Sequence, residues 1–232
     1  MPRVVHRAEV RRLVERGAHL IEVLPADEFE REHIRGAVSL PLRRIDAEAH
    51  DALDPGRPIV VYCADPACDL SARAAWRLES LGFGEVAHYE GGKLDWGAAG
   101  LPMEGTDARR TRARDIARPD VATCLVDERL GTVRARARSA GWDTCVVVNE
   151  HGVVFGILRP SDLEGPSERP VGEVMRPGPS TFRPDVPIDE MADYMTRHDL
   201  VSAPITTSDG ILVGVLLRKD AVASVARSRD VA

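Results

Sequence analysis

The stretch Ile59-Val-Val-Tyr-Cys-Ala-Asp-Pro-Ala-Cys-Asp-Leu-Ser71 decides the fold of the first half of this chain. Its four leading residues form a short apolar run, which is typical of a strand that is covered on both faces of a sheet. A polar loop follows, and over residues 70–81 leucine and alanine recur at helical spacing, which predicts a helix with one buried stripe. A strand, a loop and a helix in this order are the building units of a parallel α/β sheet.

Cys63 lies at the junction between the predicted strand and the loop that leads into the helix. Backbone N–H groups and the positive end of a helix dipole favour an anion at such a place, so the pattern favours a thiolate. Cys63 is therefore a candidate reactive thiol. The competing interpretation is that Cys63 only ends a buried strand, as cysteines often do.

The composition is that of an ordinary globular protein long enough for two domains, with 232 residues, 44% hydrophobic and 29% charged. A net charge of −6 argues against a general nucleic-acid binder. No apolar run approaches the ~18 residues that cross a bilayer. Because the first twenty residues carry charges throughout, no secretory signal is predicted. We therefore expect a cytoplasmic protein with neither a nucleic-acid nor a membrane partner.

The chain has four cysteines, which is too few for a disulfide scaffold of this length. Cys63 and Cys68 do not have the C-x-x-C spacing of a zinc or thioredoxin-like motif. Cys124 and Cys145 lie in apolar surroundings and are predicted to be core residues. With no second close pair, no metal site is predicted.

Residues 1–105 are predicted to form one α/β domain. A helical pattern over residues 7–17 leads into apolar strands at 19–24, 37–40 and 59–62, and a further strand is predicted at 86–89. Gly82 and Gly84 end the helix that follows Cys63. Residues 106–118 are polar and rich in arginine without apolar periodicity, so they are interpreted as a linker.

The remainder contains an internal repeat, with copies at residues 119–168 and 169–232. In each copy a helical stretch, at 130–140 or 188–198, precedes an apolar strand, a glycine-containing turn and a second strand. The second strands contain Gly156 and Gly214, and a helix opens near Asp162 or Asp220. A unit of this size buries its apolar face poorly alone, so the two copies are expected to pack against each other.

Residues 1–105 resemble a single-domain rhodanese, a sulfurtransferase. The match consists of residues 28–29 with 33–38, strand 60–63, and residues 89–96 with 100–102. The resemblance implies a parallel sheet with helices on both faces. It also implies that Cys63 attacks a sulfane-sulfur donor, carries the sulfur as a persulfide and passes it to a thiol acceptor. The backbone amides of the following loop would cradle the anion; this loop comprises Ala64, Asp65, Pro66, Ala67, Cys68, Asp69, Leu70 and Ser71.

This sequence departs from the family's pattern at two places: the strand predicted at residues 19–24 and the loop that follows Cys63. The family's strand commonly has Asp-Val-Arg, and here residues 22–24 are Glu-Val-Leu, so the arginine is missing. The loop is longer than the common form and contains Asp65 and Asp69 with no Lys or Arg, which lowers its attraction for an anion.

The longer loop also brings Cys68, for which three roles are open. It can resolve a persulfide or sulfenate on Cys63 as a disulfide, be the reactive thiol itself, or only pack at the helix start. A phosphatase is not favoured, because Cys68 and Arg73 are one residue too close for a phosphate-binding loop.

Residues 119–232 resemble a tandem pair of CBS (cystathionine-β-synthase) domains, an α+β module that often binds adenosine nucleotides. The second copy matches at Val174-Met175 and at 201–205, and both copies keep the glycine and the aspartate of the family signature. Arg159 and Leu217 replace the signature hydroxyl, and Arg159 can contact a phosphate, which favours the site that uses Asp162. The implied nucleotide-binding residues are Asp162, Asp220, Arg159, Gly156, Gly214 and Pro204.

The resemblances together predict a sulfurtransferase regulated by a CBS pair. No cofactor is required; the expected ligands are a small sulfur donor, a thiol acceptor and an AMP- or ATP-type regulator. CBS pairs commonly associate face to face, so a homodimer is expected. Two alternatives stay open: a catalytically silent redox or partner-binding sensor coupled to the CBS pair, and a CBS pair that only dimerises, its aspartates capping helices.

Overall fold

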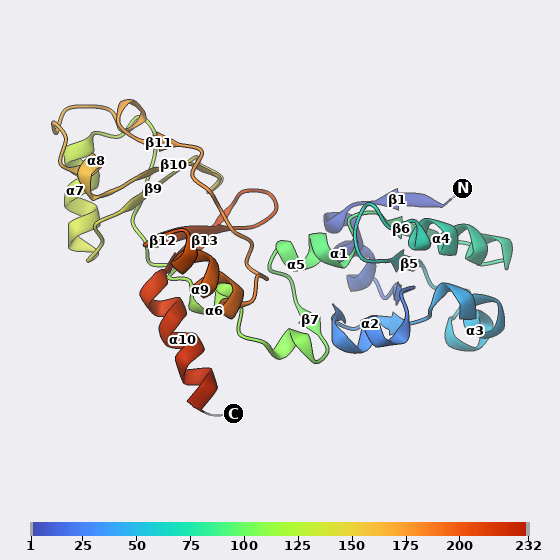
Figure 1. Ribbon diagram of the computed structural model, residues 1–232. Helices are drawn as coiled ribbons and strands as arrows, with labels where there is room; N and C mark the ends of the chain where they lie inside the picture. Colours follow the sequence, from blue (N-terminus) through green and yellow to red (C-terminus); the bar gives the residue numbers. More distant parts are fainter. Residues whose placement is uncertain (1, 231–232) are drawn as a thin grey trace. The chain divides into compact units, whose positions relative to one another are not determined.

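A computed structural model describes residues 2–230, and the chain divides into two compact units between Arg110 and Thr111 (Figure 1). This division falls inside the segment expected to be a linker. Residues after it belong to the second unit, because α6 (Ala113–Ile116) has Ala113 fully buried in the core of that unit. The linker is thus shorter than expected, since one short helix among arginines leaves no periodic signal in the sequence.

Five parallel strands form the main sheet of the first unit, in the order β1-β6-β5-β2-β4. The central strand β5 is buried at all four positions, as expected for an apolar run covered on both faces. The edge strand β1 was not expected from the sequence, because only one of its three residues is buried. The strands are β1 (Arg3–Val5), β2 (His19–Glu22), β4 (Val38–Ser39), β5 (Ile59–Tyr62) and β6 (Val86–Tyr89).

Helices cover both faces of this sheet, which confirms the predicted fold class. On one face α3 and α4 pack against Val61 and Cys63; on the other α1 and α5 pack against Val60 and Tyr62 (Figure 1). The helices are α1 (Arg7–Glu15), α2 (Ala26–Arg31), α3 (Ile45–Ala52), α4 (Leu70–Ser80) and α5 (Gly92–Ala98), with 3-10 turns η1 (Leu42–Arg44) and η2 (Asp107–Arg109). A separate pair, β3 (His33–Ile34) and β7 (Met103–Glu104), is antiparallel.

The second unit is α+β and contains two sheets, each with its own helices. One sheet has the order β11-β10-β9-β8 and packs against α7 and α8; the other is the antiparallel pair β12-β13, which packs against α6, α9 and α10. The elements are β8 (Thr123–Cys124), α7 (Leu130–Ser139), β9 (Cys145–Val148), β10 (Val154–Leu158), α8 (Pro160–Leu163), η3 (Val171–Glu173), β11 (Arg176–Pro177), α9 (Ile188–Arg197), β12 (Ser202–Thr206), β13 (Leu212–Leu217) and α10 (Arg218–Asp230).

The two halves of the second unit share an apolar cluster, as expected for repeat copies that cannot be stable alone. Val121, Trp142, Val146 and Val215 form this cluster, which joins β9 to β13. Cys124 and Cys145 are buried in the core beside α7, which confirms the prediction that they are core residues.

No helix within residues 2–230 is long and apolar enough to span a membrane.

Candidate functional site

Cys63 directly follows β5 and is almost completely buried, with 1% of its surface exposed. Its Sγ lies 3.1 Å from Oγ of Ser71, in the first turn of α4, and the thiol donates to the carbonyl oxygen of Cys68 at 3.1 Å. The C-terminal half of the loop therefore closes over the sulfur. This is the junction of strand, cysteine and helix that the sequence predicts.

The protonation state differs from the expectation. Burial raises the pKa of the Cys63 thiol, and the neighbouring Cys68 thiol raises it further, whereas the hydroxyl and amide of Ser71 lower it; the net direction is upward. The hydrogen bond that the thiol donates to the Cys68 carbonyl also requires the proton. The expected preference for a thiolate was therefore wrong for this resting geometry, because desolvation outweighs the helix start.

Asp65 turns its carboxylate back into the loop. Its Oδ1 accepts from the amide of Ala67 at 2.8 Å and from the amide of Cys68 at 3.1 Å. Two donors of the expected anion cradle are thus already satisfied by the chain itself, and Pro66 has no N–H to offer. Asp69 behaves differently, because its side chain is 73% exposed and pairs with Arg73 at 3.7 Å.

Cys68 is half-buried, neither it nor Cys63 is in a disulfide, and its thiol raises the pKa of Cys63. The resolving role would need the two sulfurs to meet. Whether Cys68 takes part in chemistry remains a prediction.

The start of α5 holds the backbone of Cys63 in place. The amide of Lys93 donates to the carbonyl of Cys63 at 3.0 Å, and the amide of Leu94 donates to that of Ala64 at 3.0 Å. Gly92 has φ +61°, and a Cβ there would lie 2.6 Å from the carbonyl oxygen of Ala64. Only glycine fits this approach. The sequence did not predict this contact.

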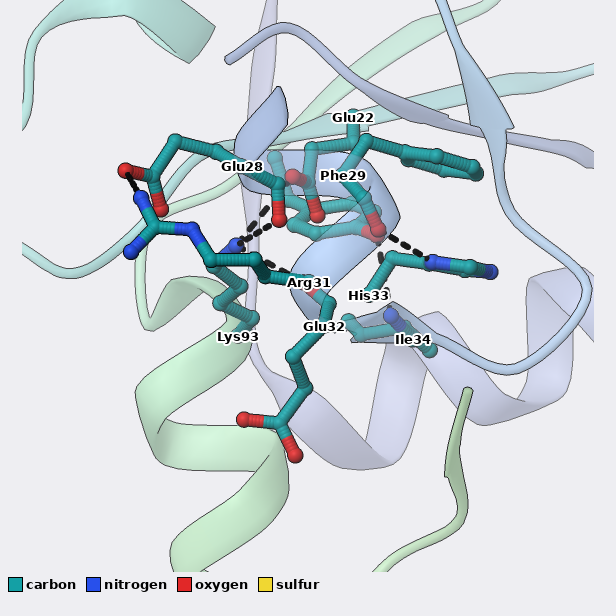
Figure 2. A network of polar contacts seen from close by, with 9 residues as sticks. Glu22, Glu28, Phe29, Arg31, Glu32, His33, Ile34 and Lys93 are labelled. Atoms are coloured by element: carbon teal, nitrogen blue, oxygen red, sulfur yellow. Dashed lines mark hydrogen bonds and ion pairs between the residues drawn. The ribbon is translucent and has the colours of Figure 1, made fainter. Parts of the chain in front are cut away.

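Lys93 also makes a buried ion pair that the sequence did not predict. Figure 2 shows its side chain reaching Glu22: Nζ lies 3.2 Å from Oε1 of Glu22 and donates to the carbonyls of Glu28 at 3.4 Å and Glu32 at 2.8 Å. The Glu22 side chain has no exposed surface. Burial raises the pKa of Glu22, and the Lys93 ammonium opposes that rise.

The Lys93–Glu22 pair matters to the site because Lys93 contacts the ends of two strands, one through its side chain and one through its backbone. Its side chain binds Glu22 at the end of β2, and its backbone binds Cys63 at the end of β5. Glu22 occupies the position where rhodaneses commonly have aspartate, so the departure noted in the sequence still places a carboxylate here.

A cavity of about 580 Å³ opens in the second unit near the end of β13. The guanidinium of Arg118 lies over the ring of Trp142, 4.8 Å from its centroid. Four cations among the lining residues, against the one carboxylate of Asp143, suit an anionic ligand. The lining residues are Arg118, Arg138, Gly141, Trp142, Asp143, Val201, Leu217, Arg218 and Lys219.

The two aspartates of the repeat have different surroundings. The carboxylate of Asp162 accepts from the amide of Arg159 at 2.9 Å and from Nε of Arg176 at 2.9 Å. Burial raises the pKa of Asp162, but these hydrogen bonds outweigh burial and lower it. Asp220 directly follows Lys219 of the cavity, in the first turn of α10. The expected preference for Asp162 as the ligand site is therefore not favoured by this geometry.

The remaining residues expected at a nucleotide have structural contacts. A Cβ at Gly156 would lie 2.6 Å from Sδ of Met175, and one at Gly214 would lie 2.7 Å from the carbonyl of Arg118. Pro204 is a buried residue of β12. Gly214 thus allows Arg118 to approach β13 and brings that residue to the cavity. Within residues 2–230 no group of three or more His, Cys, Asp or Glu side chains could hold a metal ion.

The comparisons with known proteins match two families. The rhodanese-like domain family matches residues 6–99, and the CBS domain family matches residues 171–227. The HTH-type transcriptional regulator Rv0324 of Mycobacterium tuberculosis is 34% identical over 101 residues, which cover 43% of this chain and 44% of that protein. Uncharacterized protein slr1261 of Synechocystis sp. is 39% identical over 87 residues, or 38% of this chain and 47% of that protein. The chain thus spans less than half the length of these two relatives.

Among solved structures, CBSX2 in complex with AMP is 16% identical to this chain, with a TM-score of 0.46; the match covers 51% of this chain and 98% of that one.

Proposed function

Because the chain carries a rhodanese-like domain and a CBS domain, we propose that it is a sulfurtransferase that carries a sulfane sulfur as a persulfide on Cys63. The observation that carries this proposal is the position of the Cys63 sulfur, 3.1 Å from the Ser71 hydroxyl at the start of α4. A hydroxyl and an amide at a helix start stabilise the thiolate that must attack the sulfur donor.

The proposed reaction has two displacement steps. The Cys63 thiolate attacks the outer sulfur of a hydropersulfide R–S–SH; a new S–S bond forms on Cys63, the S–S bond of the donor breaks, and R–S⁻ leaves. An acceptor thiol then gives up its proton and attacks the outer sulfur, which returns Cys63 as a thiolate. Since the resting sulfur is a thiol of raised pKa, deprotonation must precede attack, and the rate is expected to rise with pH.

We place the regulatory ligand, an adenosine nucleotide, in the cavity beside Trp142 rather than at Asp162. The guanidinium of Arg118 lies over the ring of Trp142 at this cavity, the four cations offer partners for phosphates, and Asp220 lies one residue from the lining. At Asp162 the ion pair with Arg176 competes with any ribose hydroxyl. Thermal-shift titrations with AMP, ADP and ATP test this, and stabilisation that Lys219→Gln weakens is the expected result.

A second candidate is the catalytically silent sensor, which one specific observation favours. Asp65 satisfies two loop amides, and the Cys68 thiol raises the pKa of Cys63. In this function hydrogen peroxide oxidises Cys63 to a sulfenic acid; Cys68 then attacks it, a disulfide forms and water leaves.

One set of measurements separates the two functions. Turnover of a glutathione persulfide donor is measured on the native sequence, Cys63→Ser and Cys68→Ser, with mass spectrometry for a sulfur added to the protein. Activity lost with Cys63→Ser and kept with Cys68→Ser supports the transferase. No turnover and no added sulfur, together with a Cys63–Cys68 disulfide after peroxide treatment, supports the sensor instead.

A homodimer through the second unit belongs to the same proposal. Analytical ultracentrifugation of the chain tests it, and a monomer at all concentrations would rule it out.

A further inference from the structure

The loop after Cys63 already contains the anion that its amides bind. Oδ1 of Asp65 accepts from Ala67 at 2.8 Å and from Cys68 at 3.1 Å, and both donors belong to the loop that would cradle a sulfur donor. A second anion can reach these two N–H groups only by displacing the carboxylate. It would also approach a fixed negative charge.

The other groups that face the sulfur from this loop do not offset that charge. The carbonyl of Cys68 lies 3.1 Å from Sγ and the carbonyl of Asp65 lies 4.0 Å from it, so both present negative partial charge. Residues 64–71 include Asp65 and Asp69 and no Lys or Arg. The favourable groups are the Ser71 hydroxyl and amide, which the Cys63 sulfur itself occupies.

We infer that Asp65 determines the class of sulfur donor, excluding dianions such as thiosulfate and admitting a sulfane sulfur carried on a thiol. This inference rests on the proposed sulfurtransferase function. With thiosulfate, the Cys63 thiolate would take the outer sulfur and release sulfite, so two negative charges must enter the loop and two must leave. With a hydropersulfide, the reacting –S–SH group carries at most one negative charge and the leaving group is a single thiolate.

The variant that isolates the charge is Asp65→Asn. Its amide oxygen can accept from the same two N–H groups, so the loop turn is kept while the negative charge is removed. The matched variant is Asp69→Asn, which removes one charge from the same loop at a side chain that is 73% exposed. Comparing the two separates the position of Asp65 from the net charge of the loop.

The first measurement is kcat/KM for thiosulfate and for glutathione persulfide. The native protein is expected to use the persulfide and to use thiosulfate poorly. Asp65→Asn should raise the thiosulfate-to-persulfide ratio by about tenfold, as expected for one charge removed beside a dianion, and Asp69→Asn by less than about twofold. Equal shifts for the two variants, or native use of thiosulfate as good as that of persulfide, would overturn the inference.

The second measurement does not depend on turnover. In a Cys68→Ser background, the rate at which Cys63 is modified is compared for a neutral methyl and an anionic sulfonatoethyl methanethiosulfonate. Asp65→Asn should accelerate the anionic reagent several-fold relative to the neutral one. If no donor turns over, the sulfurtransferase proposal fails while this ratio still decides the role of Asp65. A ratio that Asp65→Asn leaves unchanged overturns that role.

Discussion

The Cys63 loop of the first unit and the cavity of the second unit both offer hydrogen-bond donors to an anion. The two regions differ in the carboxylates that already pair with those donors. At Cys63 the donors are backbone amides, and a carboxylate of the same loop occupies two of them. At the cavity the donors are long cationic side chains, and their partners Asp120, Glu164 and Asp199 are 61%, 69% and 91% exposed.

The difference decides how each region responds to a ligand. Exposed ion pairs contribute about 0–1 kcal/mol each, so a nucleotide can replace the carboxylates at little cost. The loop is held by the Asp65 carboxylate within it and by the amides of Lys93 and Leu94 at its start, so its ligand must fit what is already there. The stability of the first region is therefore expected to be sensitive to changes that move its backbone, and ligand binding in the second to changes in charge.

The largest expected effect is at the buried pair behind Cys63. Lys93→Met leaves the Glu22 carboxylate, which has no exposed surface, without its cation. Breaking a buried pair from one side costs about 3–5 kcal/mol, so a drop of that order in the free energy of unfolding is expected, measured by urea denaturation.

Glu22→Gln and the double variant Glu22→Gln/Lys93→Met complete the cycle. The double variant is expected to be more stable than the sum of the two single losses, because it buries no unpaired charge. Losses that simply add would show that the pair is not coupled.

The next effect is at Gly92, where Ala would place Cβ 2.6 Å from the carbonyl of Ala64. A loss of about 3 kcal/mol in unfolding free energy is expected, from positive-φ strain and from backbone overlap together. The matched control is Gly82→Ala, where φ is +94° and nothing lies within 4 Å of the added Cβ. That variant should lose only about 1 kcal/mol. Similar losses at the two positions would contradict the close approach of Gly92 to the backbone that follows Cys63.

The Cys63 region could be predicted from the sequence to a greater extent than the cavity of the second unit. The order β5, Cys63, α4 could be predicted because its signals lie within one short contiguous stretch of sequence. The sequence shows the charge of Asp65. The turn that brings its carboxylate onto the Ala67 and Cys68 amides could not be predicted, because a loop conformation leaves no periodic pattern in the sequence. Glu22 and Lys93 could not be paired, since the topology of the sheet brings them together.

The cavity could be predicted even less. Arg118, Trp142 and Lys219 come from three separate segments, and they line one cavity only after the two repeat copies pack. In the sequence, Arg118 falls within residues 106–118, the segment interpreted as a linker. The signature aspartates gave the fold family but not their surroundings, because Arg176, the partner of Asp162, lies outside the signature.

A smaller effect is expected for a charge change at the cavity. Lys219→Glu should weaken AMP and ATP binding by about tenfold, and ATP more than AMP, because a cation facing phosphates becomes an anion. Arg227→Glu, an exposed position on the same helix α10, makes the same charge change away from the lining. Isothermal titration calorimetry on both variants measures the difference. Equal weakening by the two would mean that only net charge matters and that the ligand lies elsewhere.

The smallest effect is on the pH dependence of Cys63 itself. Since burial raises its pKa, the rate of alkylation by iodoacetamide should rise with pH through a midpoint above that of an ordinary cysteine. Cys68→Ala removes a neighbour that raises the pKa, so the midpoint should move down. Ser71→Ala removes a hydroxyl that lowers the pKa, so the midpoint should move up. Opposite shifts at positions that flank the same sulfur can arise only if both contacts act on the thiolate, whereas a general loosening of the loop would expose Cys63 and lower the midpoint in both variants.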